Sequence, residues 1–430
     1  MRTVYAVGTE FRPLARATGL AEFGGLLAEI AGRNPTLRVR CLLPRYRGMN
    51  AGRVGVPSNL EFLSVGPEVP GVEVTGGRIQ GSLPGDHDLW EQFSNEALSV
   101  IRSEKQGFGL LALDWPTGRL VATLKQRPYN CAKVTFTVDL VPGVGELAYE
   151  LWLEGVASAD TVHLPSDSWR EHLRHTPHAR PLFANEAKLN CIRYGFDATC
   201  FHLKRKEFGY SEHDLGNRRL QKQVIQDYFG LRRDADAMLV IAVNRWSKDD
   251  QKNNRLIARY ARDFLQLREG QIHLIIGNTS LQYKDERLKK EFLAIAKECH
   301  QCLAIGGMKW ENLLAGVDLQ LLPSRYEPCG LNHCQGMSMG VIPLCSRTGC
   351  MGAPPMADGQ NAFLFDWDDA ASEASSRAYF GALCRAVDRY FSHPYAWQEA
   401  VQQTMKAAFE YEWSCVVREY EQMICGNAFA

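Results

Sequence analysis

The clearest indication of the fold is the stretch at residues 317–339, VDLQLLPSRYEPCGLNHCQGMSM. Its apolar start predicts a buried strand, and Pro328 and Gly330 predict a loop that leads into a helix. A strand, a glycine-containing loop and a helix N-terminus together cradle phosphate, because unpaired backbone N–H groups and the helix dipole face the same anion. Glu327 in this loop either accepts hydrogen bonds from sugar hydroxyls or is a solvated loop residue, and the local pattern favours neither.

Short apolar runs alternate with longer amphipathic segments on both sides of this stretch. The runs predict buried strands at 4–8, 37–43, 109–113, 133–138, 160–164, 237–243, 272–277, 302–305, 317–322 and 341–345. Between them lie predicted helices at 20–31, 254–267, 285–296 and 374–391. Strands that alternate with helices predict an α/β protein, with parallel sheets covered on both faces.

The chain has 430 residues, about twice the length of a typical domain, so two domains are expected. The charged segment 204–222 separates two series of strands, which predicts two Rossmann-like domains, 1–199 and 200–407. Ligands in doubly wound sheets lie outside the carboxyl ends of the strands. We therefore expect the ligand in a cleft between the two domains.

Composition narrows the class of protein. The formal net charge is zero, so bulk electrostatics favour neither a nucleic-acid nor a membrane partner. The first residues do not have the pattern of a signal peptide, and no apolar run reaches the roughly 18 residues of a membrane span. Thirteen scattered cysteines are typical of buried thiols in a reducing compartment. These features predict a soluble cytoplasmic protein, and they leave a homo-oligomer open.

Several motifs carry a resemblance to a known family. SRYEPCGL at 324–331, with RTG at 347–349, is similar to the signature of bacterial glycogen synthases and plant starch synthases. Further similar motifs keep the family's order: EFRPLARATGLAE at 10–22, LLPRYR at 42–47, DWPTG at 114–118, ADTVHLPS at 159–166, YGFD at 194–197 and FEYEWSCVVREY at 409–420. The resemblance implies a GT-B fold, whose last segment, 408–430, packs back on the N-terminal domain.

The family also implies roles for the loop after the strand at 237–243. Arg245 and Lys252 stand where the family grips the diphosphate of a nucleotide sugar, and positive charge there stabilises the departing diphosphate. The two residues lie seven apart rather than five, so Lys248 competes with Lys252. We favour Lys252, because Gln251 precedes it as in the family.

Other predicted donor and acceptor contacts come from several loops. The phosphate cradle includes Cys329, Gly330 and Leu331, while Glu327 contacts sugar hydroxyls. The family resemblance adds these residues: Arg16 and Gly19 at the phosphates, with Thr18 in place of a glycine; Thr348 and Gly349 beside them, with Cys350 in place of a second glycine; and Asp114 on the acceptor side. Asp114 can instead cap a helix, and Tyr283 is either a base-stacking residue or a surface tyrosine.

Two departures concern the substrates. Val138 stands where the family has a histidine whose imidazole contacts the 6-hydroxyl of the sugar. A lost hydrogen bond of this kind costs about 1–3 kcal/mol, which predicts a donor sugar that differs near C6 or is held there by another group such as Asp139. The segment from Leu140 to Ala159 is short and rich in glycine, which predicts an acceptor smaller than an α-glucan.

The resemblance implies a metal-independent, retaining hexosyltransferase without a cofactor. Its substrates are a nucleotide-sugar donor, similar to ADP-glucose, and a glycan or other hydroxyl acceptor. The leaving phosphate deprotonates the incoming hydroxyl. Gln335 occupies the position eight after Glu327 that is acidic in some retaining relatives, so no carboxylate pair favours double displacement.

Two other classes stay open. A phosphorylase shares the GT-B architecture, although no lysine lies in a recognisable pyridoxal-phosphate setting. A catalytically silent homologue that serves as a binding or scaffold subunit fits the changes at Thr18, Val138 and Cys350. Single histidines (His163, His202, His333) and the Cys299–Cys302 pair are typical of core or surface groups rather than metal ligands.

Overall fold

The computed structural model describes residues 3–15, 19–49, 56–75, 77–81, 83–105, 107–126, 131–279, 285–368 and 373–426. The chain divides into two compact units. Unit 1 comprises residues 1–197 and 412–430, and unit 2 comprises residues 198–411. No described helix combines the length and apolar character needed to cross a membrane.

Unit 1 is built on an 8-stranded sheet with the order β4-β3-β2-β1-β5-β6-β7-β8. The strands are β1 (Thr3–Val7), β2 (Arg38–Arg47), β3 (Leu60–Thr75), β4 (Arg78–Gln80), β5 (Phe108–Leu113), β6 (Cys131–Thr137), β7 (Thr161–Leu164) and β8 (Leu189–Cys191). All neighbours pair in parallel except β3 and β4. Every residue of β1, β5 and β7 is buried, which explains their continuous apolar runs.

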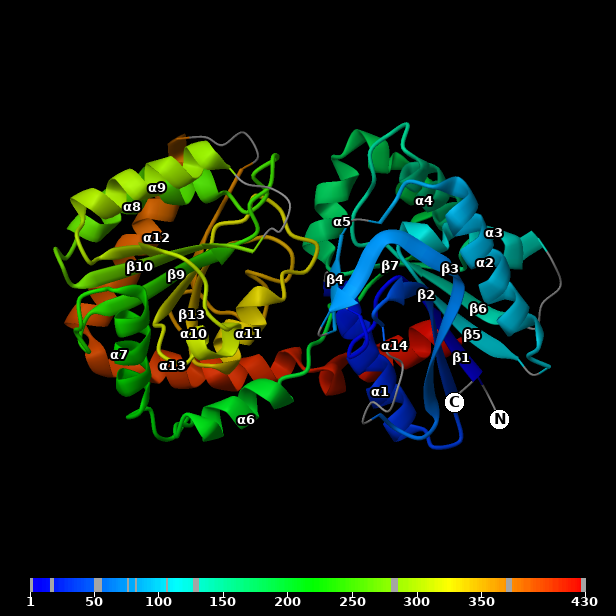
Figure 1. Ribbon diagram of the computed structural model, residues 1–430, viewed down its shortest axis with the longest axis horizontal. Helices are drawn as coiled ribbons and strands as arrows, with labels where there is room; N and C mark the ends of the chain where they lie inside the picture. Colours follow the sequence, from blue (N-terminus) through cyan, green and yellow to red (C-terminus); the bar gives the residue numbers. More distant parts are fainter. Residues whose placement is uncertain are drawn as a thin grey trace. The chain divides into compact units, whose positions relative to one another are not determined.

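Helices cover both faces of this sheet (Figure 1). They are α1 (Phe23–Arg33), α2 (His87–Arg102), α3 (Gly118–Gln126), α4 (Leu147–Ser158), α5 (Asp167–Arg174) and α14 (Trp413–Cys425), with short 3-10 segments Gly19–Glu22, Trp115–Thr117 and Pro177–Lys188. Helix α14 packs against α1, β5 and β6. Its Trp413 and Tyr420 contact the Phe23 ring at centroid distances of 5.6 and 5.7 Å. The predicted return of the last helix to the first domain is confirmed.

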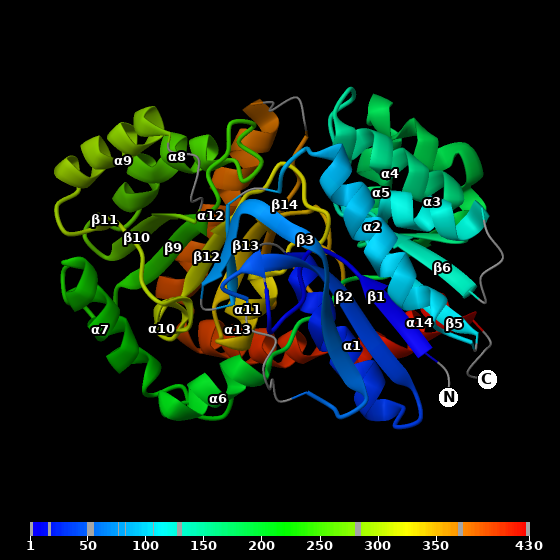
Figure 2. The same ribbon diagram turned by 45° about the vertical axis from the view of Figure 1, so that its right-hand side comes forward.

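Unit 2 contains a 6-stranded, fully parallel sheet with the order β11-β10-β9-β12-β13-β14. Its strands are β9 (Met238–Asn244), β10 (Ile272–Asn278), β11 (Leu303–Ile305), β12 (Leu319–Leu322), β13 (Ile342–Ser346) and β14 (Phe363–Phe365). Its helices are α6 (Thr199–Glu207), α7 (Arg218–Phe229), α8 (Asn254–Gln266), α9 (Glu286–Glu298), α10 (Trp310–Leu314), α11 (Asn332–Ser338), α12 (Glu373–Ser392) and α13 (Pro394–Ala408), followed by the 3-10 turn Phe409–Tyr411. Figure 2 shows that α8, α9 and α12 lie on one face of the sheet and α11 and α13 on the other.

All the predicted strands and helices are present, with shifted ends. The segment 204–222 lies between the two series of strands, as predicted, and it forms much of α6 and α7 inside unit 2. Two of its basic residues are buried rather than solvated. Arg218 donates to the Val317 carbonyl at 2.6 Å, and Lys222 pairs with Asp318 at 2.6 Å. Buried charges are tolerated when they are paired and hydrogen-bonded in this way.

Candidate functional site

The sheet of unit 2 has its topological switch point between β9 and β12. The chain passes from β9 outward to β10 and β11, then returns to β12 on the other side of β9. In open α/β sheets, ligands bind outside the carboxyl ends of the strands at this point. The loops that leave β9, β12 and β13 therefore share one edge of the sheet, and they carry most of the predicted donor residues.

The loop after β9 presents Arg245 and Lys252. The Arg245 guanidinium donates to Gln251 Oε1 at 2.5 Å. Gln251 is buried, and its own amide donates to the Tyr326 carbonyl at 3.2 Å. Lys252 forms an ion pair with Glu327, whereas Lys248 is exposed to solvent. The structure thus joins Lys252, and not Lys248, to the loop after β12.

Glu327 connects the loops after all three strands. Its carboxylate accepts from the Lys252 ammonium and from Ser324 Oγ, the latter at 2.8 Å. Its backbone N–H donates to Thr348 Oγ1 at 3.2 Å, in the loop after β13. Glu327 is only 5% exposed. The interpretation of Glu327 as a solvated loop residue is therefore wrong, whereas its contact with sugar hydroxyls stays a prediction.

Glycines allow these loops to approach closely. Gly349 has a φ of +59°, and an added Cβ would lie 2.7 Å from the carbonyl oxygens of both Glu327 and Cys329. Any side chain there would push the two loops apart. Gly330 has a φ of +87° and lies against Met351. We call Arg245, Lys252, Glu327, Thr348 and Gly349 the donor site.

The predicted helix after Gly330 begins at Asn332 and ends at Ser338. Leu331 takes the N-cap position without a side-chain hydrogen bond, so the first N–H groups of the helix have no side-chain cap. Gln335 lies in this helix and accepts from Trp310 Nε1 at 2.7 Å. The glutamine amide is therefore held by an indole.

The predicted N-terminal contacts can be placed only in part. Gly19 begins the 3-10 segment that leads into α1. Arg16 and Thr18 lie outside the described residues, and so does Tyr283. The segment before this gap is held to the 3-10 segment Gly19–Glu22 by Arg12, whose guanidinium pairs with Glu22 at 2.6 Å.

Asp114 follows β5, next to the switch point of the unit 1 sheet between β1 and β5. It takes a φ of 61° and a ψ of 179°, a backbone conformation that costs non-glycine residues about 1–3 kcal/mol. Its Oδ1 is buried and makes no hydrogen bond to the described residues. Burial, then the charges of Asp139 and Glu10, raises the pKa of Asp114 to about 8. Such strain and such a pKa are typical of functional carboxyl groups.

Glu10, Asp114 and Asp139 follow three neighbouring strands, β1, β5 and β6, and we call them the acidic cluster. Glu10 is 3% exposed. Asp139 accepts from the Tyr194 hydroxyl at 3.1 Å. The sequence motifs gave Glu10 no role, although its place three residues after the buried strand β1 is the signal that could have found it.

Val138 is fully buried, and its backbone N–H donates to the His163 carbonyl at 2.9 Å. His163 is itself a core residue, because its ring nitrogens contact Thr137 Oγ1 at 3.3 Å and the Ile192 carbonyl at 2.8 Å. Burial lowers its pKa to about 4, so the ring is neutral. The interpretation of His163 as a core histidine is confirmed.

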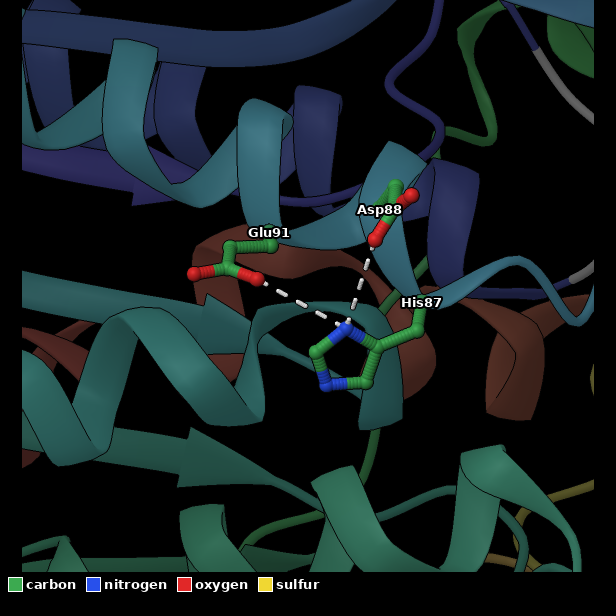
Figure 3. A group of neighbouring side chains, drawn as sticks. All are labelled: His87, Asp88 and Glu91. Carbon is green, nitrogen blue, oxygen red and sulfur yellow. Dashed lines mark ion pairs between the residues drawn. The ribbon is translucent and has the colours of Figure 1, made fainter.

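Two further features lie apart from these residues. A hollow of about 500 Å³ in unit 1 is lined mainly by residues of the bulged part of β3 together with Arg47 and Gln80. Within the described residues, one group of potential metal ligands lies close together: His87, Asp88 and Glu91 on the first turn of α2 (Figure 3). All three are exposed, and neighbouring acidic groups at a helix start are common without a metal.

Known proteins of similar sequence and structure were then compared with this chain. No protein-family model matches the chain. Glycogen synthases from Pectobacterium carotovorum and Pectobacterium atrosepticum are 29% and 26% identical to it, and each alignment covers 98% of both chains. The catalytic domain of starch synthase IV from Arabidopsis thaliana, solved with ADP and acarbose, superposes with a TM-score of 0.74 at 18% identity and covers 98% of both chains. Sucrose-phosphate synthase from Thermosynechococcus elongatus superposes at 0.65 with 15% identity, again over 98% of both chains.

Two parallel-sheet domains with these structural neighbours define the GT-B fold. Over its whole length the chain is similar to bacterial glycogen synthases.

Proposed function

We propose that this protein is a retaining glycosyltransferase that moves a sugar from a nucleoside diphosphate sugar to a hydroxyl acceptor. One observation carries the proposal. Glu327 pairs with the Lys252 ammonium through its carboxylate and donates its backbone N–H to the Thr348 hydroxyl, so the loops after β9, β12 and β13 meet at the switch point of unit 2. The starch synthase of the same fold was solved with ADP bound, which supports a nucleotide donor.

In the proposed reaction, the bond between the anomeric carbon and the diphosphate oxygen breaks while the acceptor oxygen bonds to that carbon on the same face. The proton of the acceptor hydroxyl passes to the leaving diphosphate. Arg245 and Lys252 stabilise the charge that builds on the diphosphate. Lys252 has three N–H donors, so its ammonium can keep Glu327 and also bind a phosphate oxygen.

The residues favour direct displacement over a covalent sugar intermediate. Glu327 is already engaged by Lys252 and Ser324, and the amide of Gln335 is held by Trp310. A double displacement needs an available carboxylate nucleophile next to the reacting carbon. The two cations also supply the positive charge that a metal would otherwise bring, so we propose transfer that is insensitive to a chelator.

We assign Asp114 to the acceptor. A carboxyl group with a pKa of about 8 is largely protonated at neutral pH, and it can therefore donate a hydrogen bond to an acceptor oxygen. Because Val138 offers no side-chain hydrogen bond, we propose a donor sugar that differs from glucose near C6, or one that Asp139 contacts there. We also propose an acceptor smaller than an α-glucan.

A donor and acceptor panel tests these assignments. Each of the ADP-, UDP- and GDP-sugars is incubated with short oligosaccharides or with glycogen, and the release of nucleoside diphosphate is measured with and without a chelator. We expect one nucleotide sugar to react and the new glycosidic bond to keep the donor's anomeric configuration. Strong preference for ADP-glucose, or product that sediments with glycogen, would contradict the substrate assignments.

The silent homologue is the second candidate, because Val138 removes a family contact. It predicts nucleotide binding without turnover for every donor in the panel. Release of nucleoside diphosphate that disappears in Arg245→Ala would exclude it.

A further inference from the structure

Two buried cysteines contact each other beside the donor site. Cys329 Sγ and Cys350 Sγ lie 3.2 Å apart, and the two residues are 4% and 5% exposed. The backbone N–H of Cys350 also donates to the Cys329 carbonyl at 2.9 Å. Two sulfurs that already touch, on backbones joined by a hydrogen bond, need only a small approach to reach the S–S distance of about 2.05 Å.

We propose that Cys329 and Cys350 are a reversible disulfide site whose oxidant is a peroxide. One thiolate attacks a peroxide oxygen and becomes a sulfenic acid, and the O–O bond breaks to release the first water. The second sulfur then attacks the sulfenic sulfur and displaces the second water. Two thiols lose two electrons and two protons, and the peroxide takes up both. A dithiol reductant reverses the reaction by exchange.

The geometry selects this pair among thirteen cysteines. The backbone hydrogen bond fixes the two residues side by side, and the loops that carry them are held together at Glu327 and Thr348. Neither sulfur has to leave its loop to reach the other. Hydrogen peroxide is close to water in size, although burial makes the first step slow.

The disulfide would change the donor site. An S–S bond of about 2.05 Å requires the sulfurs to approach by about 1.2 Å. Gly349 has no room to move toward the other loop, because it already packs against the carbonyls of Glu327 and Cys329. Disulfide formation therefore moves Cys329 and Gly330, where the predicted phosphate cradle begins. This consequence rests on the proposed function, and the oxidised protein is expected to bind nucleoside diphosphate at least tenfold more weakly.

Tryptic mapping tests the disulfide without any assay of activity. The full chain is treated with hydrogen peroxide, its remaining thiols are blocked under denaturing conditions, and it is digested. Cys329 lies in peptide 326–347, and Cys350 is the single cysteine of peptide 348–377. We expect these peptides to be linked through Cys329, with the loss of two hydrogen atoms, and to separate after reduction. The proposal is overturned if Cys350 stays fully blockable or is linked to another sulfur.

Binding of ADP, UDP and GDP to reduced and oxidised protein tests the consequence. Cys350→Ala should remove both the linked peptide and the sensitivity of binding to peroxide, while Cys345→Ala, equally buried in β13, should keep both. Equal affinity in the reduced and oxidised forms of the wild type would overturn the effect on the donor site. If the linked peptide forms but no nucleotide binds in either state, the disulfide stands and the proposed function fails.

Discussion

The donor site of unit 2 and the acidic cluster of unit 1 occupy the same position in their sheets but differ in their charges. Each lies at a switch point, beyond the carboxyl ends of neighbouring parallel strands. In the donor site, the carboxylate of Glu327 has an ammonium and a hydroxyl as partners. In the acidic cluster, Asp114 has an unpartnered buried oxygen and two acidic neighbours.

This difference shows that equivalent positions in the two sheets suit different chemical groups. Unit 2 places cations around a paired carboxylate, which suits a diphosphate, whereas unit 1 gathers carboxyl groups beside the apolar Val138. A shared sheet topology thus sets where ligands bind, while the side chains decide which ligand is bound. Substitutions in both units test this contrast.

The largest effect is expected from Lys252→Ala in the donor site. It removes a cation from the leaving group and leaves the buried carboxylate of Glu327 without its ion-pair partner. We expect the turnover of nucleotide sugar to fall about 10²–10³-fold. Lys248→Ala is the matched control, since Lys248 is exposed and outside this network. Equal loss in both variants would show that the donor site is assigned to the wrong lysine.

Asp114→Asn should lower activity and raise stability. The pKa of Asp114 rises on folding from an ordinary 3.8 to about 8, so its stabilising contribution is full at low pH and is lost as the pH rises through this range. Asparagine does not ionise, so the variant has no such loss. We expect Asp114→Asn to be about 1–3 kcal/mol more stable than the wild type at pH 8, after allowance for solvent screening.

Chemical denaturation of both proteins at pH 4 and pH 8 measures this difference. The gain should be present at pH 8 and absent at pH 4, while transfer to the acceptor falls about tenfold or more. A variant that is no more stable at pH 8 would mean that folding does not raise the pKa of Asp114.

Val138→His should restore a hydrogen bond to the donor sugar. A contact of this kind contributes about 1–3 kcal/mol, so kcat/KM for ADP-glucose should rise roughly 5–150-fold relative to the donor that the wild type prefers. Val138→Leu is the apolar control and should produce no such change. The account of donor choice fails if the ratio of the two kcat/KM values is the same in wild type and Val138→His.

The smallest effects are expected from two threonine hydroxyls, one in each unit. Thr348→Val removes the acceptor of the Glu327 N–H, and Thr137→Val removes a contact of the His163 ring. Each should cost about 1 kcal/mol of stability, measured by thermal or chemical unfolding. Only Thr348→Val should also raise KM for the donor, and a matching rise in Thr137→Val would remove the distinction between the two sites.

The sequence indicated most strands of both sheets, because buried parallel strands are continuous apolar runs. It did not reveal β3 and β4, since Pro67, Pro70 and Gly71 interrupt the pattern and the pairing with β2 is broken between Pro44 and Arg47. The short β8 and β14, with three residues each, are too brief to show a period.

Site residues that belong to one local motif could be predicted from the sequence. Contacts between residues from different strands could not. The stretch around Glu327 indicated a loop for a ligand, but the pairing of Lys252 with Glu327 joins residues that lie 75 positions apart. The raised pKa of Asp114 likewise results from Asp139 and Glu10, which the fold of unit 1 brings near it. The burial of Arg218 and Lys222 was hidden for the same reason, because their partners Val317 and Asp318 lie far along the chain, just before β12.

Isothermal titration of ADP, UDP and GDP into the wild type and Arg245→Ala tests the central claim most directly. We predict that at least one of these nucleotides binds the wild type, and that Arg245→Ala binds it at least tenfold more weakly, since a charge-assisted hydrogen bond contributes about 1.5–3 kcal/mol. Folded wild type that binds none of the three, or a variant that binds as tightly as the wild type, would contradict the account.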